Sequence, residues 1–347
     1  RVWDKAKKEG LIKTWQEAMG RLDTPTPLGY STAGEILECG YAVTEVSPGD
    51  KVACIGQGFA SHAEIVSIPA NLMTRIPQNV SAEQASFGML GVIALHGIRC
   101  GNLTFGGRVA IMGLGLLGLL TLQMLRAYGC EVIGFDPDSE KVRLAKKLGF
   151  ENVVNQEGEL SALVETHTRS SGVDAVLITA ATKKRDPVDQ AIQLCRSRGK
   201  IVVVGVADIH PDRNELWQKE VELVVSRAAG PGSLDPLYEI EGVDLPIGDV
   251  RWTQKRNLEE FLRLQQKGII DVSPLISHRF SIESAEDAYH QLLSGTLKNP
   301  IGVLLVYPQP PNILRQIRIP ESSPKPRIKK DSIRTGVIGA GLFGKAL

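Results

Sequence analysis

The spacing of apolar residues changes along the chain and predicts an alternation of strands and helices over residues 108–229. Short runs of Val, Ile and Leu recur there, separated by segments with helical periodicity. Such near-continuous apolar strands are typical of a parallel sheet covered by helices on both faces. The predicted strands are 108–112, 131–135, 152–155, 174–179, 200–206 and 222–226. Two βαβαβ halves of this kind form a doubly wound, α/β dinucleotide-binding fold.

The flanking segments have other patterns. Residues 1–23 are expected to form an amphipathic helix broken near Gly10, and residues 28–77 a small β-rich domain with strands such as 34–38 and 51–55. Helices are predicted over 81–103, 254–267 and 281–295, a last strand over 301–306, and a proline-rich linker over 307–330.

A glycine motif joins the first central strand to a Leu-rich helix that is expected to run to about Gly129. The first glycine of such a motif makes the tight turn, the second admits a pyrophosphate, and the third lets the helix pack on the strand. The helix N-terminus then faces the phosphate charge. The predicted cofactor-binding residues of this unit are Gly113, Gly115, Leu116, Leu117, Gly118, Asp136 and Lys141.

Asp136 ends the second central strand and predicts the choice of cofactor. Its carboxylate is expected to accept hydrogen bonds from the ribose hydroxyls. A 2′-phosphate near 4 Å would be repelled by about 4 kcal/mol at an effective dielectric of 20. No arginine follows directly, and Lys141 is close enough to reach the ribose edge. The sequence therefore predicts NAD(H) rather than NADP(H).

Composition excludes several other classes. The 347 residues suffice for two or three domains, and 40 Lys plus Arg balance 39 Asp plus Glu, which gives no electrostatic case for nucleic acid or an anionic membrane. The five cysteines contain no C-x-x-C pair and suit a reducing cytoplasm, which is the expected location. The uncharged stretch 109–125 is explained better by a strand, a phosphate turn and a helix than by a membrane span.

A second glycine motif follows close to the end of the chain. Gly339, Gly341 and Gly344 come after a short strand pattern in residues 334–344. A strand and half a helix cannot bury a core, so we expect this segment to be poorly ordered and the chain to be a fragment of a longer, two-module protein.

Taken together, these segments resemble the medium-chain dehydrogenase/reductase superfamily, which contains the alcohol dehydrogenases and quinone reductases. The resemblance spans about residues 23–306. It is carried by Pro27-Leu-Gly-Tyr-Ser-Thr-Ala-Gly34, Pro48-Gly-Asp-Lys-Val52, Ala60-Ser-His-Ala-Glu64, Gly113-Leu-Gly-Leu-Leu-Gly118 and Lys219-Glu220. The second glycine motif resembles the start of a glucose–fructose oxidoreductase/inositol dehydrogenase-type domain. Such a fusion resembles bi-domain oxidoreductases expected in sugar or polysaccharide metabolism.

The resemblance implies a domain division. A GroES-like catalytic domain, truncated at its N-terminus, is expected over residues 1–103 and again over 246–307, on either side of an NAD-binding Rossmann domain at 104–245. The linker is placed at 308–331, and the truncated start of a second Rossmann domain at 332–347. Within the fold, Gly205 and Val206 end the fifth central strand, and Ala180 and Ala228 lie at the ends of the fourth and sixth. These four residues are further predicted cofactor contacts.

The chain departs from the zinc-dependent members of the superfamily. Those members carry Gly-His-Glu where this chain has Gly29-Tyr30-Ser31, and a cysteine where it has Val92. Because catalytic zinc usually takes three protein ligands, we expect no metal. Tyr30, in the place of the lost histidine, then becomes a candidate proton donor, with Ser31 beside it and His96 expected near the nicotinamide. Each also has a structural interpretation, as a strand-turn residue or a core histidine.

The leading functional prediction is a zinc-independent, NAD(H)-dependent oxidoreductase that acts on a carbonyl or alcohol of a small molecule, with a sugar or polysaccharide precursor as one expectation. A quinone- or enoyl-type reductase and a non-catalytic dinucleotide-binding regulatory module remain alternatives. The expected partners are a small-molecule substrate, a second copy of the chain and the downstream second Rossmann domain, without nucleic acid or membrane.

Overall fold

The computed structural model describes residues 27–182 and 186–308. The predicted helix at 1–23, the proline-rich linker beyond residue 308 and the second glycine motif lie outside these residues. In the described part of the chain no helix is long and apolar enough to cross a bilayer.

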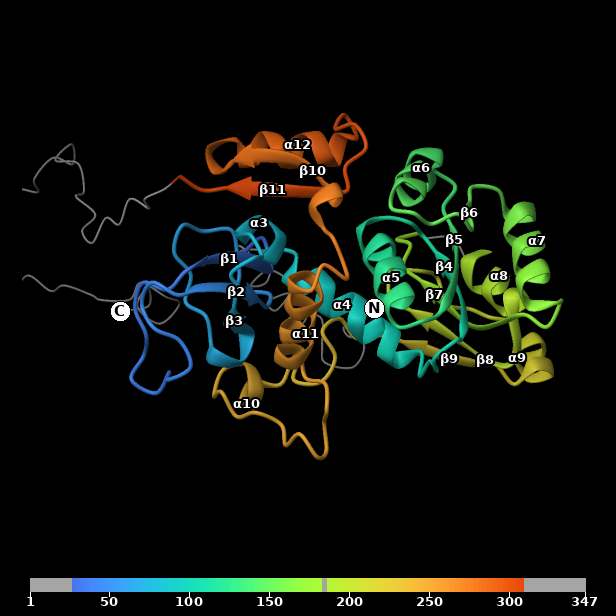
Figure 1. Cartoon of the computed structure of the whole chain (residues 1–347), viewed down its shortest axis with the longest axis horizontal. Helices are drawn as coiled ribbons and strands as arrows, with labels where there is room; N and C mark the ends of the chain where they lie inside the picture. Colours follow the sequence, from blue (N-terminus) through green and yellow to red (C-terminus); the bar gives the residue numbers. More distant parts are fainter. Residues whose placement is uncertain (1–26, 183–185, 309–347) are drawn as a thin grey trace, which may run out of the picture. The chain divides into compact units, whose positions relative to one another are not determined.

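A six-stranded parallel sheet forms the centre of the dinucleotide-binding fold (Figure 1). Its strands are β4 (Arg108–Met112), β5 (Glu131–Phe135), β6 (Val153–Val154), β7 (Val173–Ile178), β8 (Cys195–Val203) and β9 (Glu222–Val225). They are hydrogen-bonded in the order β6-β5-β4-β7-β8-β9, with all pairs parallel. From β4 the chain first adds strands on one side of the sheet, as β5 and β6, and then on the other side, as β7, β8 and β9. This is the order of two βαβαβ halves, so the predicted doubly wound sheet is confirmed.

The helices of this region connect the strands and cover the sheet. They are α5 (Leu116–Ala127), α6 (Ser139–Lys147), α7 (Glu157–Thr168), α8 (Asp186–Leu194) and α9 (Arg213–Lys219). Alternate residues of β4 contribute to different cores: Val109 and Ile111 pack with α4 and α5, whereas Ala110 and Met112 pack with α7 and α8. A strand buried on both faces needs apolar residues at every position, which explains the uninterrupted apolar run in the sequence.

A small antiparallel sheet, β1-β2-β3, lies in the N-terminal part of the described chain. Its strands are β1 (Ser31–Glu35), β2 (Lys51–Ile55) and β3 (Met73–Arg75), with the short helices η1 (Ala70–Leu72) and α3 (Ala82–Ala85) beside it. Helix α4 (Gly88–Cys100) then packs both on this sheet and on α5. Helix α4 therefore contacts both the N-terminal sheet and the first helix of the dinucleotide-binding fold.

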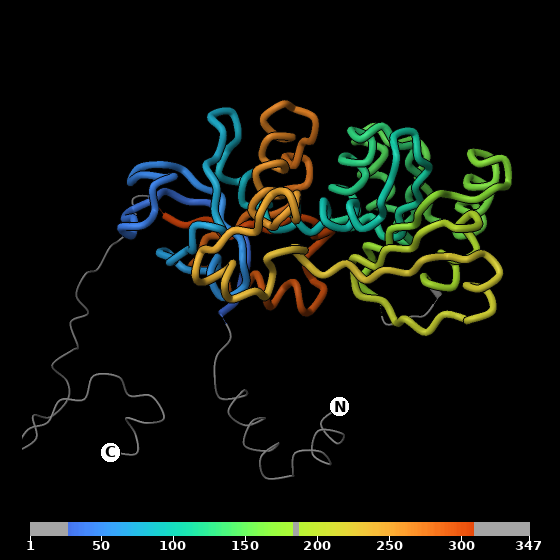
Figure 2. The backbone as a smooth tube through the Cα atoms, turned by 90° about the horizontal axis from the view of Figure 1, so that it is seen from below, coloured from blue at the N-terminus to red at the C-terminus, as the bar shows by residue number. Residues whose placement is uncertain are grey.

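The C-terminal part of the described chain returns to the N-terminal sheet. Helix α11 (Gln254–Gln266) packs on α4 and β3 and lies beside them in both views (Figures 1 and 2). The remaining elements are α10 (Pro236–Glu239), η2 (Ser273–Leu275), β10 (Ile276–Ser281), η3 (Ile282–Ser284), α12 (Ala285–Ser294) and β11 (Gly302–Val306). Strands β10 and β11 pair in parallel.

Several predicted boundaries are wrong. The first N-terminal strand occupies Ser31–Glu35 rather than 34–38, because small half-buried residues pair with β2 and the apolar residues that follow do not. The predicted helix at 81–103 is interrupted at Ser86 and Phe87. The predicted helix at 281–295 begins only at Ala285, because Ser281 ends strand β10, which the sequence analysis does not predict.

Candidate active site

The glycine motif forms a turn from β4 into α5 that leaves space beside its middle glycine. Gly113 has φ +104° and donates to the Phe135 carbonyl at 2.8 Å. A Cβ on Gly113 would lie 2.6 Å from the Ala180 nitrogen, and one on Gly118 only 1.9 Å from the Gly113 carbonyl oxygen. A Cβ on Gly115 would meet nothing within 4 Å. Packing therefore requires glycine at positions 113 and 118, whereas Gly115 leaves open a space that a ligand can enter.

The residues that follow Gly115 are also accessible. Leu116 and Leu117 begin α5 and are half-buried, whereas Gly118 and the next residues are buried. The open side of the turn thus consists of the middle glycine and the first turn of a 12-residue helix. Backbone N–H groups at such a helix end carry partial positive charge and favour a phosphate.

Asp136 is held at the carboxyl end of β5, next to this turn. Its Oδ2 accepts the Leu114 N–H at 2.8 Å and its Oδ1 accepts the Asp138 N–H at 2.9 Å. Lys141 Nζ lies 3.4 Å from Oδ2. Asp136 itself is 4% exposed. The structure therefore brings the predicted acid, the predicted lysine and the glycine turn together.

The carboxyl ends of β7 and β8 meet the same turn. The Thr179 hydroxyl donates to the Gly113 carbonyl at 2.6 Å. A Cβ on Gly205 would lie 2.1 Å from the Ala180 carbonyl oxygen, so Gly205 and Ala180 are in direct backbone contact. Val206 pairs with Ala181 in an isolated bridge and is 69% exposed. Thr179, which sequence analysis did not select, is the residue that anchors the turn to the sheet.

His96 lies on α4, opposite the loop that follows β9. Its neighbour Gly97 packs on Val204 at the carboxyl end of β8, and the His96 ring packs on Gly230. His96 Nε2 is 3.5 Å from the Cys100 thiol. Burial, followed by the positive charges of Arg227 and Arg99, lowers the pKa of His96 below its usual value.

A cavity of about 560 Å³ opens at this place. It is lined by His96, Arg227, Leu245 and residues 230–235. Ala228, a predicted cofactor contact, is exposed next to Arg227 with φ +30°. Arg227 was not selected from the sequence, although its position directly after a predicted strand end was available as a signal.

Ser31 has a structural role at the other end of α4. Its hydroxyl donates to the Ser86 carbonyl at 2.6 Å and accepts the Met89 N–H at 3.0 Å. Met89 is seven residues before His96, or about 10 Å along a helix. Ser31 and His96 therefore do not form a catalytic pair.

Tyr30 is 43% exposed and lies near Tyr289. The phenol of Tyr289 is 2.9 Å from His62 Nε2, and the His62 ring packs against Gly29. Burial raises the pKa of Tyr289, and the proximity of Tyr30 raises it further. The phenol of Tyr30 is accessible, as a proton donor must be, and it has Tyr289 as a neighbour that the sequence did not indicate.

The donor set does not fit a catalytic zinc ion. Val92 is fully buried and apolar, and Ser31 is occupied by backbone groups. In residues 27–182 and 186–308 there is no group of three His, Cys, Asp or Glu side chains that could hold a metal. The described residues therefore do not fit a catalytic zinc ion, and the expected absence of zinc stays a prediction.

Comparisons with known proteins identify relatives of the chain. Residues 117–239 match the family described as zinc-binding dehydrogenase. L-idonate 5-dehydrogenase of Vitis vinifera is 28% identical over 82% of this chain and 80% of its own length. Alcohol dehydrogenase of Geobacillus stearothermophilus is 33% identical over 52% of each chain.

The fold is shared with solved structures. Galactitol-1-phosphate dehydrogenase from Escherichia coli matches with a TM-score of 0.66 and 23% identity, over 81% of this chain and 84% of that chain. At this identity the match concerns the fold alone. The matched family and the sequence relatives are dehydrogenases, so the chain is an enzyme similar to the alcohol dehydrogenase-like, medium-chain dehydrogenases.

Proposed function

We propose that the chain is a zinc-independent, NAD(H)-dependent oxidoreductase that acts on an alcohol or carbonyl group of a sugar-derived substrate. The observation that supports it most is the junction of the open glycine turn with the carboxylate of Asp136, which accepts the Leu114 N–H. A bound nicotinamide would supply or accept the hydride. The regions 27–103 and 246–307 would form the GroES-like catalytic domain.

The residues around the turn would hold the cofactor. The space beside Gly115, together with Leu116 and Leu117, suits the pyrophosphate, because a side chain there would fill it. Asp136 and Lys141 would bind the adenosine ribose. Ala180, Gly205, Val206 and Ala228 would line the remaining path along the carboxyl edge of the sheet, where ligands of this fold bind.

Asp136 supports NAD(H) over NADP(H). Its two oxygens already receive backbone donors, so its position is fixed and it cannot move away from a 2′-phosphate without breaking those bonds. Lys141 offsets part of the repulsion, since it lies within 3.5 Å of both oxygens. The repulsion that remains favours the ribose hydroxyls.

The names of two similar proteins support the proposed substrate class. One is named for the sugar acid L-idonate, and the shared fold includes a dehydrogenase named for a sugar-alcohol phosphate. A polyhydroxylated substrate agrees with a cavity whose wall includes His96, Ser233 and backbone groups of two glycines.

Tyr30 is the proposed proton donor or acceptor. Without a zinc ion, the oxygen of the reacting carbonyl needs another group to stabilise its developing charge or to protonate it. The Tyr30 phenol is accessible and replaces the histidine of zinc-dependent members. His96 is kept as a second candidate, close to the nicotinamide end of the site.

The experiment is a substrate screen with NAD⁺ and polyols or aldonates, and with NADH and the corresponding ketoses, using protein treated with a chelator and analysed for zinc. Turnover that survives zinc removal supports the proposal. Turnover restored only by added zinc would show that zinc independence is wrong. NADH binding without turnover on sugars or quinones would instead favour a regulatory dinucleotide-binding module.

A further inference from the structure

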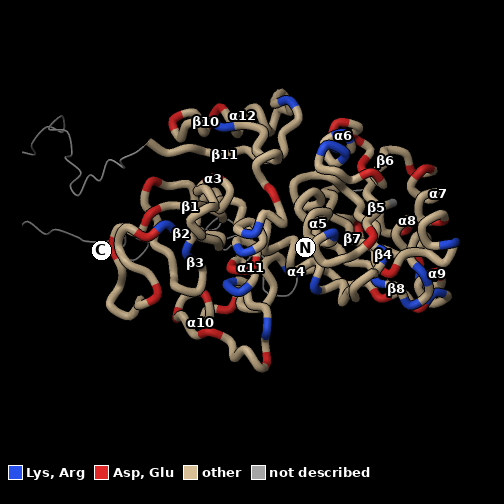
Figure 3. Tube along the Cα trace, in the orientation of Figure 1, with Lys and Arg blue, Asp and Glu red and all other residues tan. Residues whose placement is uncertain are grey.

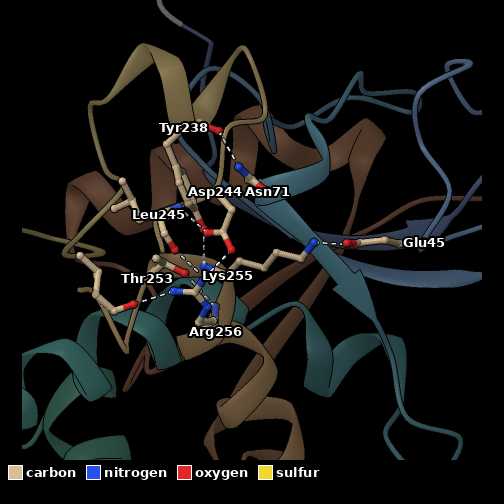
Figure 4. A network of polar contacts seen from close by, with 9 residues as sticks. Glu45, Asn71, Tyr238, Asp244, Leu245, Thr253, Lys255 and Arg256 are labelled. Atoms are coloured by element: carbon tan, nitrogen blue, oxygen red, sulfur yellow. Dashed lines mark hydrogen bonds and ion pairs between the residues drawn. The ribbon is translucent and has the colours of Figure 1, made fainter. Parts of the chain in front are cut away.

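The cavity beside His96 has a wall that is fixed in place. Arg256 donates to the carbonyls of Val250 at 2.6 Å and Leu245 at 2.8 Å, and it is paired with Asp244 (Figure 4). The Tyr238 hydroxyl accepts the Lys255 N–H at 3.3 Å. The segment from residue 238 to residue 250, which carries Leu245 into the cavity lining, is thereby attached to the start of α11.

The same network connects the wall to the N-terminal region. Asn71 Nδ2 donates to the Tyr238 carbonyl at 3.0 Å, and Lys255 is paired with Glu45 (Figure 4). Tyr238 is fully buried. A wall with this many anchors keeps its shape before a ligand binds, which reduces the entropy lost on binding.

Arg227 brings a positive charge to this cavity, and its charge is not compensated there. Its Nη2 donates to the Gly230 carbonyl at 3.3 Å. In the described part of the chain, no carboxylate lies within ion-pair distance of its guanidinium. Asp235 also lines the cavity, but its Oδ1 accepts the Leu237 N–H at 3.1 Å and caps α10.

Arg99 adds a second positive charge near His96, and Arg251 lies near Arg99. The guanidinium carbons of Arg99 and Arg251 lie 3.4 and 3.9 Å from the centre of the Trp252 ring. Arg99 donates from Nε to the neutral Asn257 side chain at 2.8 Å. Glu260 is near Arg99 but is paired with Arg263 at 2.6 Å. Elsewhere charges of both signs are mixed, as along α6, α9 and α11 (Figure 3).

From this arrangement we infer that the cavity binds an anionic group of the substrate, a carboxylate or a phosphate, and that Arg227 recognises it. A guanidinium provides paired donors that match either group, and a charge-assisted hydrogen bond is stronger than a neutral one. The inference rests on the proposed function, because it names the class of substrate for the same site. The substrate is then an acidic or phosphorylated sugar derivative rather than a neutral polyol.

The location agrees with this role. His96 touches Gly230 of the cavity wall, and Gly97 packs on Val204 at the carboxyl end of β8. The cavity is therefore at the edge of the sheet where the nicotinamide is proposed to bind. An anion held by Arg227 would fix one end of a sugar chain and leave its hydroxyl-bearing carbons at that edge.

The test compares three probes of similar size: D-sorbitol, D-gluconate and D-sorbitol 6-phosphate. Their binding to the full chain is measured by calorimetry, with and without saturating NADH. We expect at least one anion to bind about 10- to 100-fold more tightly than sorbitol, as a charge-assisted hydrogen bond predicts. Preference for gluconate identifies a carboxylate, and preference for the sorbitol phosphate identifies a phosphate.

Variants assign the preference to Arg227. Arg227→Met should remove it, and Arg227→Lys should keep part of it. Arg213→Met, at an exposed position on α9, should keep all of it. Thermal unfolding checks that each variant is folded. Equal binding of sorbitol and both anions, or an unchanged preference in Arg227→Met, overturns the inference. Failure of NADH to bind would overturn the proposed function instead. The comparison of the anions with sorbitol in the absence of NADH would still test whether Arg227 binds an anionic group.

Discussion

The Leu114 N–H donates a 2.8 Å hydrogen bond to Asp136 Oδ2, which joins the glycine turn to the carboxylate that is proposed to select the cofactor. The two residues lie 22 positions apart in the sequence and just beyond the ends of the neighbouring strands β4 and β5. Whatever moves the turn therefore also moves the proposed ribose-binding group. We therefore expect a change in either feature to weaken dinucleotide binding.

Asp136→Ala should weaken NADH binding by about 10- to 100-fold, since the ribose hydroxyls lose a charged acceptor. Binding of NADPH should fall less or rise, because the repulsion of its phosphate is removed. Both affinities are measured by fluorescence titration. Asp138→Asn is the matched control: that side chain caps α6 by accepting the Glu140 N–H, and its change should leave the preference for NADH intact. An unchanged preference in Asp136→Ala would contradict the assignment.

Gly115→Ala and Gly118→Ala should separate binding from folding. The first adds a methyl group in open space at φ −69°, so the protein should unfold at nearly the parental temperature but bind NADH about tenfold or more weakly. The second places a Cβ against the Gly113 carbonyl and should cost about 3 kcal/mol of unfolding free energy. Equal NADH affinity in Gly115→Ala and the parent would show that the pyrophosphate does not approach this glycine.

Ser31 and Tyr30 should respond differently to truncation. Ser31→Ala leaves the Met89 N–H and the Ser86 carbonyl without their partner and should cost about 1–2 kcal/mol of unfolding free energy. Tyr30→Phe should leave stability close to that of the parent and reduce turnover by about 10²-fold if the phenol is the general acid. Denaturant unfolding and steady-state kinetics of both variants check this. Unchanged turnover in Tyr30→Phe would remove it from the mechanism.

His96 should make stability depend on pH. Burial, then Arg227 and Arg99, keep its folded-state pKa below the unfolded value of about 6.5. Between those two values the unfolded chain binds more protons, so stability falls as the pH falls through about 6.5 toward the lowered pKa. His96→Asn should reduce the loss in melting temperature between about pH 7.5 and about pH 5.5. His62, whose pKa burial also lowers, contributes with the same sign.

The control for this experiment is His290→Asn, at an exposed position of α12. It should melt with the same pH dependence as the parent. If the melting temperature of His96→Asn also has the pH dependence of the parent, the His96 imidazole does not change its protonation on unfolding.

The central sheet could be predicted because burial on both faces leaves a strong signal. Ile111 and Met112 face different cores, so both must be apolar. The β1 strand could not be placed well, because Thr32 and Ala33 are half-buried and their pairing with β2 depends on partners 22 and 20 residues away. Strand β10 pairs with β11 across α12, a contact that local periodicity does not encode.

Part of the candidate site could also be predicted from the sequence. Glycines and an acid at fixed spacing identified the turn and Asp136, because steric and electrostatic demands act on nearby residues. The cavity beside His96 depends on Arg227 and Leu245, which only the folding of three separate segments brings together. The role of Ser31 at α4 was missed for the same reason, since its partners are more than 50 residues away.

The most direct measurement is a side-by-side titration of the full chain with NADH and NADPH, followed by thermal unfolding. At a concentration of 100 times the dissociation constant, binding should add about 2.7 kcal/mol to the free energy of unfolding. We expect NADH to stabilise the protein at much lower concentrations than NADPH. Equal or stronger stabilisation by NADPH would contradict the role of Asp136, and no response to either would contradict the proposed dinucleotide site.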